Sequence, residues 1–143
     1  MLLYVGFPEF EIKLLQGAAK ELGVLESCKF IAEMGSKDKA GDIIDATAIY
    51  NKLPSVIFLN LDSKVEHWKK SLAALKDHSK LKVIPVVGLG RISDSEVSEL
   101  YDMNINSYIK KPDTFEEMVR IAGISLNFWL EISHVPVIYL TDT

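Results

Sequence analysis

Apolar residues along the chain follow two alternating patterns, continuous short runs and stretches with an apolar residue at every third or fourth position. The first pattern is typical of buried strands and the second of amphipathic helices. The runs lie at residues 2–6, 28–33, 54–62, 83–87 and 107–110. Helical spacing follows each of them, at residues 8–23, 40–50, 63–75, 93–101 and 114–132. The pattern therefore predicts five β-α units.

Residues that begin and end helices support these boundaries. Ser/Thr followed three positions later by Glu is the spacing of a capping box, and glycine favours the end of a helix or strand. We expect Gly23 to end the first helix, and Gly88 and Gly90 to close the fourth strand. The predicted helix starts are the pairs Ser63 and Glu66, Ser93 and Glu96, and Thr114 and Glu117.

The alternation of strands and helices predicts the fold class. Several of the strands are apolar throughout, which favours a parallel sheet covered on both faces. Right-handed crossovers then give a doubly wound α/β fold with three layers and the flavodoxin-like strand order 2-1-3-4-5. We expect one domain over residues 1–143, with residues 135–143 as a tail appended after the last helix and apolar in residues 135–140.

Composition excludes several classes of protein. The chain has a net charge of −4, with lysines scattered among acids, so nucleic-acid binding and membrane binding are not expected. Cys28 is the only cysteine, which rules out an internal disulfide and a thiolate metal cage. Residues 1–5 lack a basic region before the apolar run, as expected of a first strand rather than a signal peptide. We therefore predict a cytoplasmic location.

The third strand ends in Asn60, Leu61 and Asp62, and this end is where chemistry is expected. In an open α/β sheet, ligands bind at the carboxyl ends of the strands. The side chain of Asn60 is an amide, which donates and accepts hydrogen bonds but is a poor nucleophile.

These elements resemble the receiver domain of two-component response regulators over nearly the whole chain. The resemblance rests on the strand that ends at Asn60, on residues 82–87 and on residues 106–112, which include Lys111-Pro112. Residues 128–131 followed by Val135-Pro136 are similar to the stand-alone receivers that partner phytochromes. The resemblance implies a phosphoryl transfer from a kinase histidine to a receiver aspartate, assisted by a divalent cation, a lysine and a hydroxyl.

Laid over the family pattern, the sequence lacks most of that machinery. The phosphoacceptor position falls on Asn60, and the paired metal-binding acids fall on Val5 and Gly6, or on Gly6 and Phe7 in the other register. The hydroxyl position falls on Gly90. The family lysine and aromatic positions are kept as Lys111 and Tyr108.

The resemblance thus implies a degenerate receiver that is not an enzyme. We expect no cofactor, no metal ligands, and weak or absent magnesium binding. Lys111 is expected either to pair with Asp62, the nearest remaining carboxylate, or to point outward. Trp68 either belongs to a recognition surface or packs beneath its own helix.

Two functional hypotheses follow. The favoured one is a phosphorylation-independent interaction module that binds a histidine kinase, another receiver or a second copy of itself. The alternative is a phosphoryl-transfer protein, or one that binds a nucleotide or small ligand, with Asp62 and Lys111 in the inherited crevice.

The last helix carries two apolar stripes. We expect the first to face the sheet; it comprises Phe115, Met118, Val119, Ala122, Leu126 and Trp129. The second is a predicted protein interface, possible as a homodimer contact, and comprises Ile121, Ile124, Phe128 and Ile132. The alternative for this second stripe is burial beneath the tail of residues 135–140.

Overall fold

A parallel five-stranded sheet forms the centre of the molecule. The computed structural model describes residues 1–31, 39–62 and 65–140. The strands are β1 (Leu2–Val5), β2 (Cys28–Ile31), β3 (Val56–Asn60), β4 (Val86–Gly90) and β5 (Ser107–Lys110), in the order β2-β1-β3-β4-β5. The predicted fold class and strand order are confirmed. The end of the second predicted strand, residues 32–33, lies outside the described residues.

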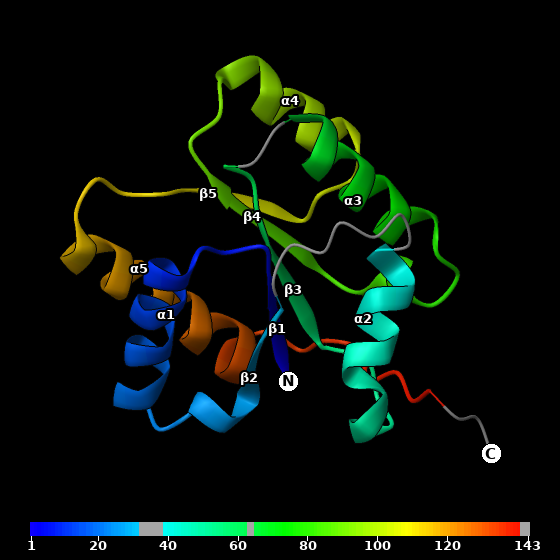
Figure 1. Ribbon diagram of the computed structural model, residues 1–143, viewed down its shortest axis with the longest axis horizontal. Coiled ribbons are helices and arrows are strands. Elements are labelled where there is room, and N and C mark those ends of the chain that lie inside the picture. The colour runs from blue at the N-terminus through cyan, green and yellow to red at the C-terminus, as the bar shows by residue number, and fades with distance from the viewer. Residues whose placement is uncertain (32–38, 63–64, 141–143) are drawn as a thin grey trace.

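Helices cover both faces of the sheet and complete three layers (Figure 1). One layer holds α1 (Glu9–Glu21) and α5 (Phe115–Asn127), and the other holds α2 (Lys39–Thr47), α3 (Val65–Asp77) and α4 (Asp94–Asp102). Among the described residues, 3-10 turns lie between a helix and the strand that follows it, at Leu25–Ser27, Ala48–Tyr50 and Leu81–Val83. A π-helical turn, Phe128–Ile132, prolongs α5. The last helical segment ends at Ile132, as predicted.

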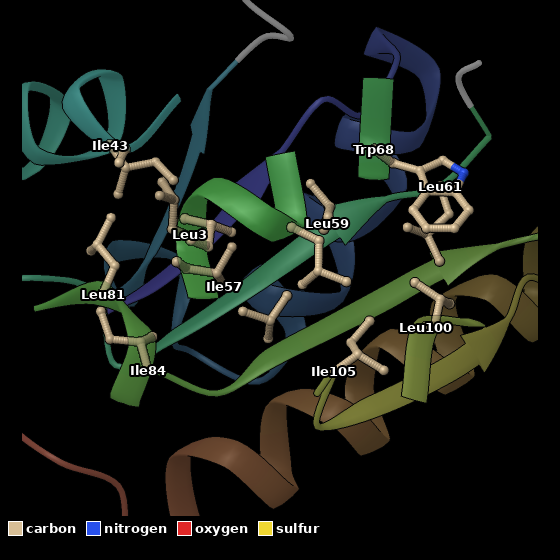
Figure 2. Packing of buried hydrophobic residues seen from close by; sticks show 14 of the residues in the cluster. Leu3, Ile43, Ile57, Leu59, Leu61, Trp68, Leu81, Ile84, Leu100 and Ile105 are labelled. Atoms are coloured by element: carbon tan, nitrogen blue, oxygen red, sulfur yellow. The ribbon is translucent and has the colours of Figure 1, made fainter. Parts of the chain in front are cut away.

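Each face of the sheet has its own apolar core. On the α2–α4 side, the core contains Leu3, Ile57 and Leu59 of the strands. It also contains Leu72 and Trp68 of α3, and Trp68 is only 1% exposed. Figure 2 shows Trp68 lying beside Leu61 in this core. On the α1–α5 side, Tyr4 stacks on Phe58 with ring centroids 4.5 Å apart. Trp68 is therefore a core residue and not part of a recognition surface.

The helix ends follow the local chemistry of the sequence. Gly23 adopts a φ of 71°, and the N–H groups of Gly23 and Val24 donate to Lys20 O and Ala19 O, the pattern of a Schellman cap. Ser93 and Glu96 form the predicted capping box, and these hydrogen bonds hold the pKa of Glu96 below its usual range.

The other two predicted helix starts have different outcomes. Thr114 caps α5 by accepting from Glu117 N, whereas the Glu117 carboxylate pairs with Arg120. The predicted box of Ser63 and Glu66 lies partly outside the described residues, since Ser63 is not described.

The prediction for the fourth strand was wrong by three residues. The strand is Val86–Gly90, so Gly88 and Gly90 lie within it instead of closing it. The strand reaches Gly90 because its residues pair there with β3 and β5, and Leu61 packs so closely beside it that a Cβ on Gly88 or Gly90 would lie 2.6 or 2.7 Å from its side chain. The contact with Leu61 favours glycine at both positions, more strictly at Gly90, where the contacts include the Leu61 backbone.

The prediction for α5 holds for its centre and is wrong at its start. Met118, Ala122 and Leu126 are buried against the sheet, but Phe115 is 67% exposed and its ring lies 6.5 Å from that of Phe10. Phe115 is the first residue of α5, and its side chain lies near Phe10 of α1 instead of facing the sheet.

The tail does not cover the second stripe. Within it Ile124 is 55%, Phe128 43% and Ile132 66% exposed. Instead, the tail runs to the segment before β3, where Leu53 N donates to Ile138 O at 2.8 Å and Leu140 N donates to Asn51 O at 3.1 Å. The alternative of burial beneath the tail is therefore wrong for these three residues.

Candidate functional site

The carboxyl edge of the sheet gathers four polar side chains around one point. Asn60 is the last residue of β3, Asp62 follows it by two positions, and Lys111 comes directly after β5. Glu11, in the first turn of α1, reaches the same point. The sequence predicted the approach of the first three residues and missed the fourth.

Asn60 is fixed by hydrogen bonds on both atoms of its amide. Its Nδ2 donates to the carbonyl of Gly6 at 2.9 Å, and its Oδ1 accepts from Lys111 Nζ at 2.7 Å and from the backbone N–H of Asp62 at 3.2 Å. The amide thereby ties the end of β1 to the loops after β3 and β5. This arrangement uses the donor of an amide, which an ionised carboxylate does not have.

The ammonium of Lys111 is at the centre of the site. The side chain is only 1% exposed, and Nζ donates to Glu11 Oε1 at 2.8 Å and to Asn60 Oδ1 and Asp62 Oδ2 at 2.7 Å each. An ammonium has three N–H donors, so these three acceptors use its full capacity. Of the two expectations for Lys111, pairing with Asp62 is correct and pointing outward is wrong.

Glu11 was not predicted as a site residue, although the sequence carries a signal for it. It lies four positions before Leu15 and seven before Ala18, on the side of α1 that is buried against the sheet. A charged residue at an apolar position of an amphipathic helix is buried only if it is paired. The Glu11 side chain is 7% exposed, and its carboxylate pairs with Lys111.

Asp62 is held from a second side by Arg91. Its Oδ1 accepts from the backbone N–H of Arg91 at 2.7 Å, and the Arg91 guanidinium lies 3.6 Å from Oδ2. Arg91 also donates from Nη2 to the carbonyl of Pro112 at 2.6 Å. The loops after β3, β4 and β5 are thus joined through one carboxylate and one guanidinium.

The other predicted positions form the backbone frame of the site. Val5 ends β1, and Gly6, which follows it, adopts a φ of 81° and donates from its N–H to Ile31 O. Gly90 ends β4, and its carbonyl accepts from the hydroxyl of Tyr108 at 2.7 Å and from Lys111 N at 3.0 Å. These residues offer backbone carbonyls and one phenol, but no further carboxylate.

The arrangement pairs two acids with two bases. The negative charges of Glu11 and Asp62 balance the positive charges of Lys111 and Arg91. The described residues contain no group of three or more His, Cys, Asp or Glu side chains that could hold a metal ion. The chemistry that the four side chains offer is mutual neutralisation, since each carboxylate already accepts from the buried ammonium. The site therefore joins α1 to three loops at the sheet edge.

The second stripe of α5 lies apart from this cluster. A groove of about 470 Å³ runs beside it, with walls from β5 and α5 that include Ile109, Ile124, Phe128 and Trp129. Ile121 is only half-buried.

In the described part of the chain, no helix combines the length and the apolar character needed to cross a bilayer.

The sequence matches two curated proteins over part of its length, while no protein-family model matches it. One is described as probable methanogenesis regulatory protein FilR2 of Methanothrix harundinacea (strain 6Ac), 31% identical over 85 residues, which are 59% of this chain and 55% of that protein. The other is response regulator Rcp1 of Synechocystis sp. (strain ATCC 27184 / PCC 6803 / Kazusa), 29% identical over 58% of this chain and 57% of that protein. The matches thus span a little over half the length of these relatives.

Solved structures match over nearly the whole chain. The Mn(2+)-bound form of response regulator Rcp1 has a TM-score of 0.76 at 22% identity, covering 94% of this chain and 97% of that one. The phosphorylated cyanobacterial phytochrome response regulator RcpA has a TM-score of 0.75 at 24% identity, covering 94% and 96%. At this identity the likeness shows a shared fold. Together, the curated relatives and the solved structures show that the chain has the fold of response regulator receiver domains and is similar to response regulators in sequence over a little over half its length.

Proposed function

We propose that this receiver domain acts in two-component signalling as a protein-binding module that needs no phosphorylation cycle. The observation that carries the proposal is Asn60, at the end of β3, whose amide bonds to both Gly6 and Lys111. An amide there cannot accept a phosphoryl group, and its two bonds stabilise one arrangement of the site.

Asp62 is a poor replacement for the missing phosphoacceptor. Its Oδ2 accepts from Lys111 and its Oδ1 from Arg91 N, both at 2.7 Å. Charge-assisted and backbone hydrogen bonds to both oxygens stabilise the negative charge of the carboxylate, which lowers its reactivity as a nucleophile. The engagement of Asp62 therefore supports a module without phosphoryl transfer.

A divalent cation does not fit the side chains as they stand. One structural relative is described as Mn(2+)-bound, and Mn²⁺ prefers several oxygen ligands. Here the converging oxygens of Glu11, Asn60 and Asp62 all bond to the ammonium of Lys111. A cation at that point would have to displace a paired, buried charge, which supports weak or absent magnesium binding.

The partner surface in this proposal is the second stripe of α5, Ile121, Ile124, Phe128 and Ile132. Three of the four side chains are more than 40% exposed, and the groove between β5 and α5 adjoins them. Exposed apolar side chains grouped on one face are typical of protein-binding surfaces. Candidate partners are a histidine kinase, another receiver and a second copy of this chain.

Intact mass spectrometry tests the proposal after incubation with acetyl phosphate and Mg²⁺. We expect no phosphoryl adduct, and no thermal stabilisation by Mg²⁺ with beryllofluoride. A receiver that has a phosphorylatable aspartate, treated in parallel, controls for reagent quality.

A phosphoryl adduct on the protein would contradict the proposal and favour the alternative, a phosphoryl-transfer protein. The Asp62→Asn variant then identifies the acceptor, since loss of the adduct in this variant would assign the chemistry to Asp62. Thermal stabilisation by a nucleotide would favour the alternative of a ligand-binding protein.

A further inference from the structure

Three oxygen atoms from three different elements converge on the Lys111 ammonium at distances of 2.7–2.8 Å. Two of the oxygens belong to carboxylates, and the third is the amide oxygen of Asn60. Convergence of carboxylate and amide oxygens on one point is the donor set that hard divalent cations select. In this chain an internal positive charge is placed at that point.

Burial and pairing hold the Lys111 ammonium in place. The Lys111 side chain is 1% exposed, the Glu11 carboxylate is 7% exposed, and the ring of Phe7 lies 5.3 Å from the ammonium. A buried charge is stable only when paired and hydrogen-bonded, and here every donor of the ammonium has an acceptor. Asp62, at 30% exposure, leaves one side of the cluster open to water.

We propose that the Lys111 ammonium is the resident cation of a divalent-cation site, and that it excludes metal ions by occupying the point where Glu11, Asn60 and Asp62 converge. This inference deepens the proposed function, on which it rests for the absence of a metal-dependent cycle. It adds a specific claim. The oxygens of Glu11, Asn60 and Asp62, called the oxygen cage below, still form a site for a cation, and the Lys111 side chain occupies it.

Glu11 is the residue that distinguishes this cage from a simple surface ion pair. Without it, Lys111 would pair only with Asp62, an interaction that water partly screens. With it, two carboxylates flank the ammonium, and removal of the ammonium leaves the buried Glu11 charge uncompensated and Asp62 paired only with Arg91. A divalent cation entering from the open side would neutralise both.

The test is Mn²⁺ binding to the full chain with Lys111→Met, a substitution that keeps the apolar stem and removes the charge. We expect no measurable Mn²⁺ binding to the wild type by calorimetry at millimolar metal. The variant should bind Mn²⁺ at least ~10-fold more tightly, because an ammonium a few ångströms away repels a divalent ion strongly even in partly screened sites. Mn²⁺ should also raise the melting temperature of the variant but not that of the wild type.

Two controls connect the effect to the cage. Lys110→Met removes a neighbouring charge from an exposed position and should leave Mn²⁺ binding unmeasurable. In Glu11→Gln combined with Lys111→Met, the affinity for Mn²⁺ should fall below that of Lys111→Met alone. Lys111→Gln, which keeps a hydrogen-bond donor, replaces Lys111→Met if that variant does not fold without metal.

The results separate this inference from the proposed function. Measurable Mn²⁺ binding by the wild type, or no gain in either neutral variant at position 111, would overturn the inference, while phosphorylation of the wild type would overturn the proposed function. A gain that survives Glu11→Gln unchanged would also overturn it, because the metal would then not be in the cage.

Discussion

Leu61 determines which side chain position 90 can carry. A Cβ built on Gly90 would lie 2.7 Å from Leu61 Cβ and 3.2 Å from the backbone carbon of Leu61. Neither atom is the end of a flexible side chain, so the contact can be relieved only by moving the backbone after β3. A side chain larger than that of glycine at this position therefore requires a shift of the backbone.

We predict that Gly90→Ala lowers the free energy of unfolding by about 1–3 kcal/mol, the usual cost of overpacking a rigid site. Gly17→Ala is the matched control, because a Cβ added to Gly17 in α1 would meet nothing within 4 Å. That substitution should be neutral or stabilising by up to ~1 kcal/mol, since alanine favours a helix over glycine. Urea unfolding of both variants measures the difference, and equal stabilities would contradict the packing argument.

The site shows which residues a sequence can reveal and which it cannot. Asn60 and Asp62 were predicted from the carboxyl end of the third strand, and Lys111 from the resemblance to receivers, which left its pairing with Asp62 open. Glu11 comes from a helix, and its position depends on how α1 lies against the sheet. Its place on the buried side of α1 was visible in the periodicity, but its pairing with Lys111, one hundred residues away, was not.

At the scale of elements, glycine in β4 misled the prediction of the strand boundary. Glycine is common at strand ends, but here Gly88 and Gly90 both pair within the strand, and Leu61 packs where their side chains would lie. The boundaries of α4 were predicted better, since Ser93 and Glu96 act within one turn of the chain. Local signals were therefore predictable, whereas a boundary set by pairing with other strands was not.

The exposed stripe of α5 leads to a prediction about association. Ile124→Glu and Phe128→Glu should weaken binding to the partner, or self-association if the partner is a second copy, because each places a charge on an apolar contact surface. Central contact residues contribute roughly 2 kcal/mol or more, so the dissociation constant should rise at least about tenfold. Sedimentation equilibrium measures this for self-association.

Ile49→Glu is the matched control for this surface. Ile49 is 85% exposed and follows α2, in the layer across the sheet from α5. Its substitution should leave the sedimentation of the protein unchanged. If the wild type and all three variants sediment alike as monomers, the second stripe is not a self-association surface.

At the scale of the whole molecule, the segment after α5 connects the two cores. Val135 packs against the core on the α1–α5 side, whereas Ile138 and Leu140 pack against the core on the α2–α4 side. Between them, the backbone pairs with the segment before β3 through an antiparallel bridge of Lys52 and Tyr139. The chain thus passes from one layer to the other at the edge opposite the candidate site.

This crossing predicts that substitutions of two neighbouring tail residues, Ile138 and Val137, change the free energy of unfolding by different amounts. Ile138→Ala should lower the free energy of unfolding by about 1–2 kcal/mol, less than for a fully buried isoleucine because Ile138 is partly exposed. Val137 is 63% exposed, and Val137→Ala should change stability by no more than ~0.5 kcal/mol. Urea unfolding provides both values. Equal changes in the free energy of unfolding would mean that the tail does not hold the described strand-like pairing in solution. A loss of stability confined to Ile138→Ala would show that the tail stabilises the fold while leaving the α5 surface open to a partner.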